Sequence, residues 1–522
     1  MTNAPSRFPF SFEPLTPVSF LSRSALVFAT DIAVIEGNLR FTYRDLDIRS
    51  KRLAFLLRSK GVNRGDRVAV LASNNHVMLE SHYGVPIAEA VLVTLNTRLA
   101  ISELVSIVNH SGCKVIIHDV AHTDAANEVA MAIDREPTLL VADERYENSL
   151  IEGPGLGTPA VDELSLLAIN YTSGTTGAPK GVMYHHRGAY LQSLAMTNHF
   201  DLDSSSKYLW TLPMFHCNGW CFTWAVTAAG GTHVCMPDFD AQEAWRLISE
   251  HSVTHFCAAP TVLTMLTTST DAISVKGKEI RVAVGGAPPS PSLIAKCETL
   301  GLSVTHLYGL TETFGPVAIC DWKSEWVDLP SDERSLRRAR QGVGNIVSHS
   351  LRVVDASGSD VPRDGVSLGE IIVRGNNVML GYYNDDAATN LAVTGGWFHT
   401  GDIAVMHQDS YVEIRDRAKD VIISGGENIS SLEVEFVLVS HRAVLEAAVV
   451  SVPHEHWGER PIAFVTLNEG ESVSEDELRN FAKSHLARFK VPDHIIFGSL
   501  PKTSTGKIQK QVLRSRVKEC FD

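Results

Sequence analysis

Apolar and polar residues follow two different periods along the first two-thirds of the chain, and these periods alternate. Residues 42–60 have helical spacing of apolar positions, with Thr42 as a cap and Gly61 as a stop signal. β-rich runs follow at 67–71, 91–95 and 114–118, with a helical pattern at 101–109 before the third. Strands that alternate with helices predict an α/β architecture with largely parallel sheets.

Three later strand-like runs, at 255–260, 281–286 and 304–309, each end in a turn. Ligands of such sheets gather beyond the carboxyl ends of the strands, so we expect these turns to carry the chemistry. From residue 351 to about 414 the pattern changes to short strands and Gly/Asp turns, which predicts a β-rich subdomain.

The last hundred residues have a different character. Ser474 and Glu477 form a capping-box pattern that predicts a helix. One face of this helix carries Leu478, Phe481, Ala482, His485, Leu486 and Phe489. Residues 483–518 contain nine Lys or Arg and one acid, Asp493. This basic stretch is either a solvated surface or a surface that meets polyanionic small molecules.

Composition narrows the class of protein. The 522 residues are 44% hydrophobic and 20% charged, and the net charge of −14 argues against a general nucleic-acid or membrane-surface binder. No apolar run approaches the ~20 residues of a membrane span, and the eight cysteines form no repeating framework. The start lacks a signal-peptide pattern and the end lacks an S-K-L address, so we expect a cytoplasmic protein.

Residues 171–182, Y-T-S-G-T-T-G-A-P-K-G-V, have the composition of an anion-binding loop. Backbone N–H groups of a glycine-rich turn can surround a phosphate, and hydroxyl side chains add donors. The segment is not a P-loop, because Ala178 and Pro179 separate Gly177 from Lys180. We expect a phosphate site of another kind, formed by Thr172, Ser173, Gly174, Thr175, Thr176, Gly177 and Lys180.

In this order of residues, the loop resembles the phosphate loop of the adenylate-forming superfamily. That superfamily includes acyl-CoA synthetases, luciferases and peptide-synthetase adenylation domains. Later segments resemble the family's further motifs and occur in the family's order, at 285–289, 308–313, 396–402, 415–420 and 501–508. The resemblance covers nearly the whole chain, although His454 stands where family members often have Asp.

The resemblance implies a fold of two unequal parts. A large N-terminal domain, residues 1–416, would combine two doubly wound α/β subdomains with a small distorted β-barrel at about 345–416. A small mobile α+β C-terminal domain, residues 417–522, would follow, with a hinge at Lys419.

The resemblance also assigns roles to single residues. Tyr308 lies beside the adenine, Thr311 meets the α-phosphate, and Glu312 helps to hold Mg²⁺, which suits an aromatic face, a hydroxyl and a carboxylate. Asp402 accepts from the ribose hydroxyls, and Arg417 also reaches the ribose. Besides the phosphate loop, the expected nucleotide site contains Gly286, Ala287, Pro288, Tyr308, Gly309, Thr311, Glu312, Asp402, Arg417 and Lys507. The expected metal ligands are Thr172 and Glu312, and the expected catalytic residues are Lys507, Glu312 and His216.

Members of this family activate a carboxylic acid with ATP. The acid takes the AMP, which gives a mixed anhydride with a good leaving group, whereas a P-loop serves transfer of the γ-phosphoryl group. Lys507 and a Mg²⁺ ion at Glu312 suit the neutralisation of charge when carboxylate and phosphate approach each other.

The acyl acceptor is indicated by residues 422–428, which resemble the loop beside the pantetheine tunnel of CoA ligases. Ser424, Gly425, Gly426 and Glu427 are the expected contacts of coenzyme A, because glycines let a thin thiol arm pass close to the backbone. A simple strand-to-helix turn is the alternative interpretation of this segment.

The acid itself is indicated by residues 212–220, which resemble the segment that opens the acyl pocket. Amino-acid-activating members have an aspartate there, and its absence favours an apolar acid. Trp220 coincides with a gating tryptophan of some long-chain fatty-acyl-CoA synthetases. Residues 321–326 instead resemble plant-type acyl-activating enzymes and methylmercaptopropionate-CoA ligases, which prefer short, medium or aryl acids, and we favour these. The expected pocket residues are His216, Asn218, Gly219, Trp220 and Gly309.

Three functions remain open from the sequence. The leading hypothesis is an ATP-dependent acid–CoA ligase for a hydrophobic acid, with a homodimer as one option for its assembly. The second is an enzyme that loads a carrier protein, or a luciferase-like oxidative member. The third is a non-catalytic binding protein, against which the presence of Lys180, Glu312 and Lys507 argues. A metal site at His216, Cys217 and Cys221 is disfavoured, because a fourth ligand and a recognised spacing are missing.

Overall fold

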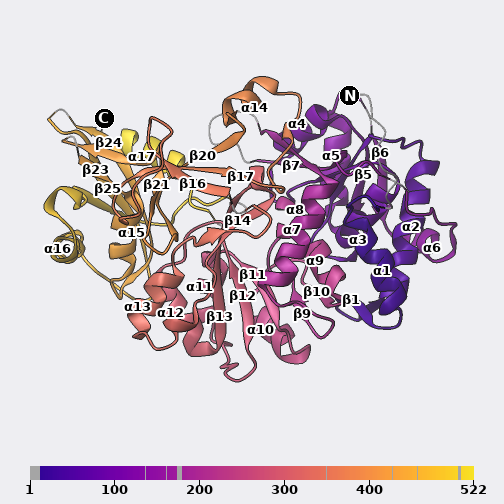
Figure 1. Cartoon of the computed structure of the whole chain (residues 1–522), viewed down its shortest axis with the longest axis horizontal. Coiled ribbons are helices and arrows are strands. Elements are labelled where there is room, and N and C mark those ends of the chain that lie inside the picture. The colour runs from indigo at the N-terminus through magenta and orange to yellow at the C-terminus, as the bar shows by residue number, and fades with distance from the viewer. Residues whose placement is uncertain are drawn as a thin grey trace.

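The computed structural model describes residues 12–135, 137–159, 161–172, 179–348, 350–425, 427–454, 456–503 and 507–521. Figure 1 shows an α/β body that leads into a smaller group of helices and strands at the C-terminal end. The expectations for Ser173, Gly174, Thr175, Thr176, Gly177 and Gly426 lie outside the described residues. None of the helices in the described ranges is long and apolar enough to cross a membrane.

A seven-stranded sheet forms mainly from the first third of the chain, in the order β18-β8-β7-β4-β3-β5-β6. Its strands are β3 (Arg67–Leu71), β4 (Val91–Thr94), β5 (Cys113–Asp119), β6 (Thr138–Ala142), β7 (Leu166–Tyr171), β8 (Gly181–His185) and β18 (Gly381–Tyr382). The strands from β3 to β7 pair in parallel, whereas β8 and β18 pair antiparallel. The accompanying helices are α2 (Tyr43–Ser59), α3 (His76–Ile87), α4 (Ile101–Ser111), α5 (Thr123–Ala132) and α6 (Glu144–Glu152).

Helix α2 begins and ends where the sequence predicts. The hydroxyl of Thr42 accepts the N–H of Asp45, and Gly61 has a φ of +82° just beyond the helix. A left-handed φ favours glycine, which has no Cβ to clash with the backbone. The predicted cap and stop of this helix are therefore confirmed.

A nine-stranded sheet forms the second half of the body, in the order β15-β14-β13-β12-β11-β9-β10-β1-β2. Its strands are β1 (Ile32–Glu36), β2 (Leu39–Thr42), β9 (Lys207–Leu209), β10 (Thr232–Cys235), β11 (His255–Ala258), β12 (Ile280–Val284), β13 (Leu302–Leu310), β14 (Gly315–Ile319) and β15 (Val343–Gly344). Its helices are α1 (Val18–Val27), α7 (His186–His199), α9 (Phe222–Ala229), α10 (Ala241–Glu250), α11 (Pro260–Thr268), α12 (Pro291–Leu300) and α13 (Ser331–Arg338). The three later strand predictions are confirmed as β11, β12 and β13.

The predicted β-rich segment forms a five-stranded sheet of antiparallel pairs. It contains β16 (Ser350–Val354), β17 (Gly369–Arg374), β19 (Val393–Thr394), β20 (Trp397–Met406) and β21 (Val412–Arg417). One short helix, α14 (Asp386–Ala392), interrupts the segment, because the Asp385 side chain accepts the N–H of Ala388 as a cap.

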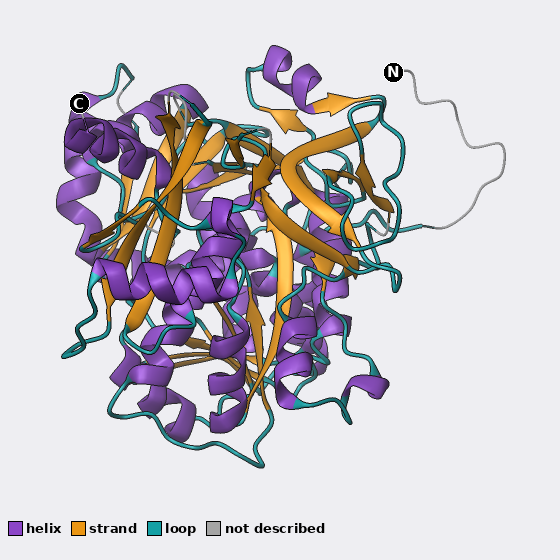
Figure 2. Ribbon diagram, turned by 90° about the vertical axis from the view of Figure 1, so that its left-hand side faces the viewer, coloured by secondary structure: helices purple, strands orange, loops and turns teal. Residues whose placement is uncertain are grey.

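The C-terminal group of elements has a mixed sheet and three α-helices. Its strands are β22 (Ile422–Ser424), β23 (Glu427–Ile429), β24 (Val444–His454), β25 (Gly458–Leu467) and β26 (His494–Phe497), and its helices are α15 (Ser431–Val439), α16 (Glu475–His485) and α17 (Lys510–Phe521). Figure 2 views the molecule from the side of these elements. Helix α16 is capped by Ser474 as predicted but ends at His485. Phe489 therefore lies beyond its apolar face, in the separate turn Arg488–Lys490.

The fold brings several strand ends to one region. Strand β7 leads into Thr172, β12 leads into Gly285 and Gly286, and β13 leads into Thr311 and Glu312. All twelve residues of α3 are buried, as expected for a helix that core surrounds on every side. The sheets thus hold the predicted turns in fixed places at their carboxyl ends.

Candidate active site

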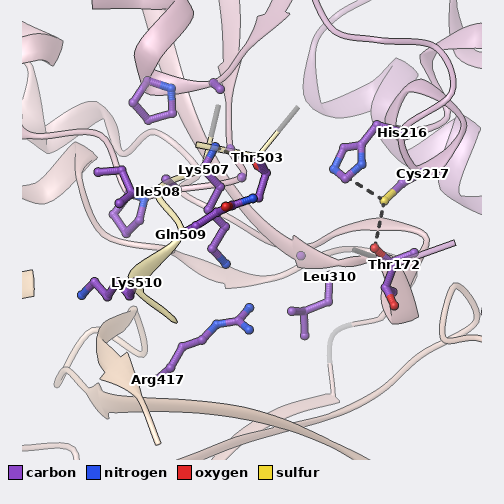
Figure 3. Close-up of a pocket in the computed structure, with 18 of the residues that line it drawn as sticks. Thr172, His216, Cys217, Leu310, Arg417, Thr503, Lys507, Ile508, Gln509 and Lys510 are labelled. Carbon is purple, nitrogen blue, oxygen red and sulfur yellow. Dashed lines mark hydrogen bonds between the residues drawn. The ribbon is translucent and has the colours of Figure 1, made fainter. Parts of the chain in front are cut away.

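A cavity of about 1750 Å³ lies where the strand ends of the body meet the C-terminal elements. Figure 3 shows Lys507 and Arg417 on one side of it, and His216 and Cys217 on the other. Residues separated by hundreds of positions line this one cavity. Among the predicted site residues, its lining includes Thr172, Lys180, His216, Trp220, Gly286, Ala287, Pro288, Tyr308, Gly309, Thr311, Glu312, Asp402, Arg417, Lys419 and Lys507.

Asp402 is held from two sides on the wall of the cavity. Its Oδ2 accepts a 2.7 Å hydrogen bond from the Tyr308 hydroxyl, and its Oδ1 lies 3.1 Å from Nε of Arg417. The ion pair follows from the fold, because Asp402 and Arg417 are directly opposed on the antiparallel strands β20 and β21. A buried carboxylate fixed in this way is a suitable acceptor for sugar hydroxyls.

The glycines on the adenine side occupy positions that a larger residue cannot take without strain. Gly286 has a φ of +83° after β12. A Cβ on Gly309 would lie 2.0 Å from the carbonyl oxygen of Gly315. Gly309 therefore lets β13 pack closely against Gly315 at the start of β14, and Gly286 permits the left-handed turn after β12.

Burial and nearby charges lower the pKa of both Lys507 and His216 at the cavity. Although Lys507 keeps exposed surface, protein surrounds its amine, and this burial together with the charge of Arg417 lowers the pKa of Lys507 to about 8. Burial and then the charge of Lys507 lower the pKa of His216 to about 4. At neutral pH the cavity therefore presents an ammonium group on one side and a neutral imidazole on the other.

The ends of the phosphate loop are joined by the sheet. The N–H of Thr172 donates to the carbonyl oxygen of Lys180 at 3.0 Å, next to the antiparallel pair β7 and β8. Thr172 and Lys180 therefore flank the cavity together, and the loop residues between them lie outside the described ranges.

Glu312 has a partner that the sequence did not indicate. The hydroxyl of Tyr382 donates to its Oε1 at 2.8 Å, and Lys180 Nζ lies 4.7 Å from the centroid of the Tyr382 ring. The only sequence signal was a Gly-Tyr-Tyr triplet at 381–383, which is too common to single out. Among the described residues, Oε2 of Glu312 accepts no hydrogen bond and pairs with no basic side chain, so it is available to a cation.

The predicted acyl-pocket segment is a left-handed turn. Five consecutive residues have left-handed φ values: Cys217 +43°, Asn218 +46°, Gly219 +59°, Trp220 +51° and Cys221 +65°. Such a conformation costs roughly 1–2 kcal/mol per non-glycine residue. It persists only where the surroundings hold it, and strained backbone of this kind is often found at ligand sites.

Hydrogen bonds of Asn218 to two buried residues hold this turn. The side-chain Oδ1 of Asn218 accepts from Nδ2 of Asn170 at 2.9 Å, and its Nδ2 donates to Nε2 of His82 at 3.0 Å. The backbone N–H of Asn218 also donates to Oδ1 of Asn170 at 2.9 Å. Burial lowers the pKa of His82 to about 4, and Nδ1 of the neutral ring donates to the carbonyl oxygen of Met78. Asn218 is fully buried and Gly219 packs on Trp210, so neither lines the cavity, contrary to expectation.

Trp220 does line the cavity, at the end of the turn. A Cβ on Gly285 would lie 2.9 Å from its indole, and a Cβ on Gly315 would lie 3.3 Å from its Cα. The two glycines thus make room for the tryptophan, which is only 6% exposed. The indole therefore limits the cavity on this side.

The described residues among the expected CoA contacts do not line the cavity. Ser424, Gly425 and Glu427 belong to the β22–β23 hairpin and are absent from the lining of the cavity, whereas Lys419 is part of it. A Cβ on Gly425, whose φ is +60°, would lie 2.9 Å from the ring of Trp457. In this arrangement the structure brings Lys507, and not the hairpin, to the nucleotide side of the cavity.

The described residues contain no group of three His, Cys, Asp or Glu side chains that could hold a metal ion by themselves. Cys217 Sγ lies 4.0 Å from Nε2 of His216, and Cys221 Sγ lies 3.8 Å from the Phe314 carbonyl oxygen.

Comparison with known proteins identifies the family. The model of the AMP-binding enzyme family matches residues 21–383, and the AMP-binding enzyme C-terminal domain matches residues 433–507. The chain belongs to the AMP-binding enzyme family. Its place in the acid–CoA ligase branch follows from relatives that match over nearly their whole length, and confirms the resemblance seen in the motifs.

One such relative is the peroxisomal acetate/butyrate–CoA ligase of Arabidopsis thaliana, 41% identical over 98% of this chain and 96% of the relative. A 2-methylpropanoate–CoA ligase of Humulus lupulus is 42% identical over 97% of this chain and 96% of its own. The peroxisomal trans-cinnamate:CoA ligase of Petunia hybrida is 40% identical over 97% of this chain and 95% of its own.

Solved structures of AMP-binding enzymes confirm the predicted fold class. ATP-bound MatB from Rhodopseudomonas palustris superposes with a TM-score of 0.85 at 26% identity, covering 97% of this chain and all of MatB. The o-succinylbenzoate CoA synthetase of Bacillus subtilis, in complex with its acyl-adenylate, superposes with a TM-score of 0.83 at 27% identity. The match covers 98% of this chain and 99% of the synthetase. The boundary between residues 416 and 417 stays a prediction.

Proposed function

We propose that this AMP-binding enzyme is an ATP-dependent acid–CoA ligase that forms an acyl-adenylate and transfers the acyl group to coenzyme A. The observation that carries the proposal is the convergence of Lys507, Asp402 and Glu312 on one cavity. Full-length relatives named as CoA ligases support the same reaction.

In the first step a carboxylate oxygen of the acid attacks the α-phosphorus of ATP, and the bond to pyrophosphate breaks. Tyr308 and the Gly286 turn form the adenine side, and Asp402 with Arg417 binds the ribose. The Lys507 ammonium offsets the negative charge that gathers between the two anions. His216 stays neutral near pH 7, so its imidazole can donate a hydrogen bond to the acid without adding a second fixed charge.

The residues present fit a Mg²⁺ ion. Glu312 offers Oε2, which makes no hydrogen bond or ion pair among the residues that the structure describes, and the Thr172 hydroxyl belongs to a residue that lines the same cavity. Hard oxygen ligands of this kind suit Mg²⁺, which usually binds one or two protein groups together with substrate phosphates. When bound, the ion supplies charge neutralisation at the phosphates.

For the acid, we propose a short or small aryl carboxylic acid. Trp220 limits the pocket, and the turn at residues 217–221 carries no acidic side chain that could pair with a substrate ammonium. Relatives named for acetate, butyrate, 2-methylpropanoate and trans-cinnamate support this class. A long-chain fatty acid is the alternative, and it would require the Trp220 indole to move out of the pocket.

For the second step we propose that the C-terminal elements rotate about Lys419. Lys507 lines the cavity in this structure, whereas Ser424, Gly425 and Glu427 of the hairpin do not. One active site can serve both reactions if a rigid rotation moves Lys507 out of the cavity and brings the hairpin in. Such domain rotations are a common way to alternate two functions. The site for CoA at this hairpin, the cytoplasmic location and a homodimer remain parts of the proposal, and two of the relatives are named as peroxisomal.

Two half-reactions test the function. Acid-dependent exchange of pyrophosphate into ATP should occur with short acids, and CoA-dependent release of AMP should occur without any carrier protein. Lys507→Ala should lose most exchange but still convert supplied acyl-adenylate and CoA to the thioester. Exchange that proceeds while CoA fails as acceptor would favour loading of a carrier protein, and absence of exchange with every acid would reject the proposal.

A further inference from the structure

Tyr382 joins two residues of the phosphate side that are far apart in the chain. Its hydroxyl donates to Oε1 of Glu312 at 2.8 Å, and its ring faces Lys180 Nζ at 4.7 Å. Tyr382 is 7% exposed, so both contacts belong to a side chain that packing holds in place. An ammonium group over an aromatic face is attracted by its π-electrons.

The backbone around Tyr382 is attached to both partners. Strand β18 pairs with β8 directly after the phosphate loop, with Tyr382 opposite Val182. The N–H of Met379 donates to the Glu312 carbonyl oxygen at 2.9 Å. The segment 379–383 therefore connects the turn that carries Glu312 with the strand that follows Lys180.

The electrostatics suit a fixed donor. A phenol has an ordinary pKa of about 10, so at neutral pH the Tyr382 hydroxyl carries the proton that it donates to Oε1 of Glu312. With Oε1 bound to this hydroxyl, the carboxylate cannot turn freely, and its orientation is set before any ligand arrives.

We propose that Tyr382 is a positioning residue that aims Oε2 of Glu312 at the cation of the bound nucleotide and holds Lys180 over its ring, directly before β8. This inference rests on the proposed function, because it assumes that a metal–nucleotide complex binds in the cavity. Tyr382 acts through Glu312 and Lys180, and it needs no contact with the reacting atoms.

The test is Tyr382→Phe, which keeps the ring and removes only the hydroxyl. Binding of Mn²⁺ in the presence of ATP, followed by electron paramagnetic resonance, should weaken roughly tenfold, as expected for loss of one hydrogen bond to a charged group. The Mg²⁺ concentration for half-maximal pyrophosphate exchange should rise by a similar factor, with an unchanged KM for the acid. Tyr383→Phe removes a hydroxyl from the neighbouring position and should leave the Mn²⁺ affinity unchanged.

A double-mutant cycle separates positioning from a general structural effect. If Tyr382 acts through Glu312, adding Tyr382→Phe to Glu312→Gln should cause no further loss of Mn²⁺ affinity. The proposal is overturned if folded Tyr382→Phe binds Mn²⁺ and ATP like the wild type, or if its loss persists undiminished beside Glu312→Gln. Because Mn²⁺ binding needs no acid or CoA, failure of the proposed ligase reaction would appear separately, as absent exchange in the wild type.

Discussion

Lys510 Nζ lies 2.7 Å from Oε1 of Glu435, and both side chains are largely covered by protein. The same ammonium group donates to Oγ of Ser431, and Oε1 of Glu435 also accepts the N–H of Val449. Lys510 begins α17, three positions after Lys507. This buried pair therefore anchors the segment that brings Lys507 to the cavity.

Lys510→Met should destabilise the protein strongly. Removing one partner of a buried ion pair leaves an uncompensated charge and typically costs about 3–5 kcal/mol. The free energy of unfolding in urea measures this loss. Lys502→Met is the matched control, since its pair with Glu446 is more exposed and worth about 1 kcal/mol or less. Equal effects of the two substitutions would show that the Lys510 pair does not anchor the segment.

The rate of adenylation should fall above pH 8. The pKa of Lys507 is lowered to about 8, so its ammonium group loses its proton as the pH rises through that value. Initial rates of pyrophosphate exchange between pH 6.5 and 10, with saturating ATP and acid, measure the profile. In Lys507→Arg the charge persists, so any remaining activity should lack this descending limb. A wild-type profile that stays flat through pH 9 would contradict the proposed role of the charge.

Acid should destabilise the fold through its buried neutral histidines. Burial lowers the pKa of His82 and His306 to about 4 and of His233 to about 3, below the usual 6.5. The unfolded chain therefore binds more protons below pH 6.5, and stability falls as the pH drops from 6.5 towards 4. The pKa of His76 shifts in the opposite direction. Its burial lowers this pKa, but its hydrogen bonds to Glu147 and Glu36 outweigh the burial and raise it to about 10. The contribution of His76 to the free energy of unfolding is fully present below pH 6.5. His76→Gln should therefore lower stability, and the loss of stability between pH 6.5 and 4 should remain.

Asn218→Ala should weaken binding of the acid more than binding of ATP. The substitution removes the Asn218 side-chain amide, which accepts from Nδ2 of Asn170 and donates to Nε2 of His82. Nε2 of the buried His82 then loses its hydrogen bond, at a cost of about 1–3 kcal/mol, so the turn can relax. Steady-state kinetics should show a raised KM for the acid and a KM for ATP close to the wild type. Gly219→Ala should act in the same direction, because a Cβ there would lie 2.7 Å from Trp210. If both KM values rise together, the turn does not set the acyl pocket.

Trp220→Ala should change the preferred acid. Its indole lines the cavity, so its removal enlarges the pocket and should shift relative kcat/KM towards bulkier acids, with a loss of about 3–5 kcal/mol in stability. Trp224→Ala is the control, since Trp224 is fully buried and lies outside the lining. It should lose stability without changing the order of acids. The same order in the folded Trp220 variant would reject a pocket role.

Local patterns in the sequence predicted much of the fold. Helix α2 begins after Thr42 because a hydroxyl side chain caps the free N–H groups of a helix, and this needs only neighbours along the chain. The alternation of strands and helices, and the strands β11, β12 and β13, likewise follow from local periodicity. The residues of the nucleotide side could be named because their order along the chain resembles a known family.

Tertiary structure alone decided which side chains meet. The contact of Tyr382 with Glu312 joins residues 70 positions apart, and it depends on the pairing of β18 with β8. The left-handed turn at Asn218 opposes local backbone preference, and buried partners from distant segments, Asn170 and His82, help to hold it. Sequence patterns report what each segment favours by itself, whereas hydrogen bonds between distant segments can overrule that preference. The candidate active site depends on these hydrogen bonds between distant segments.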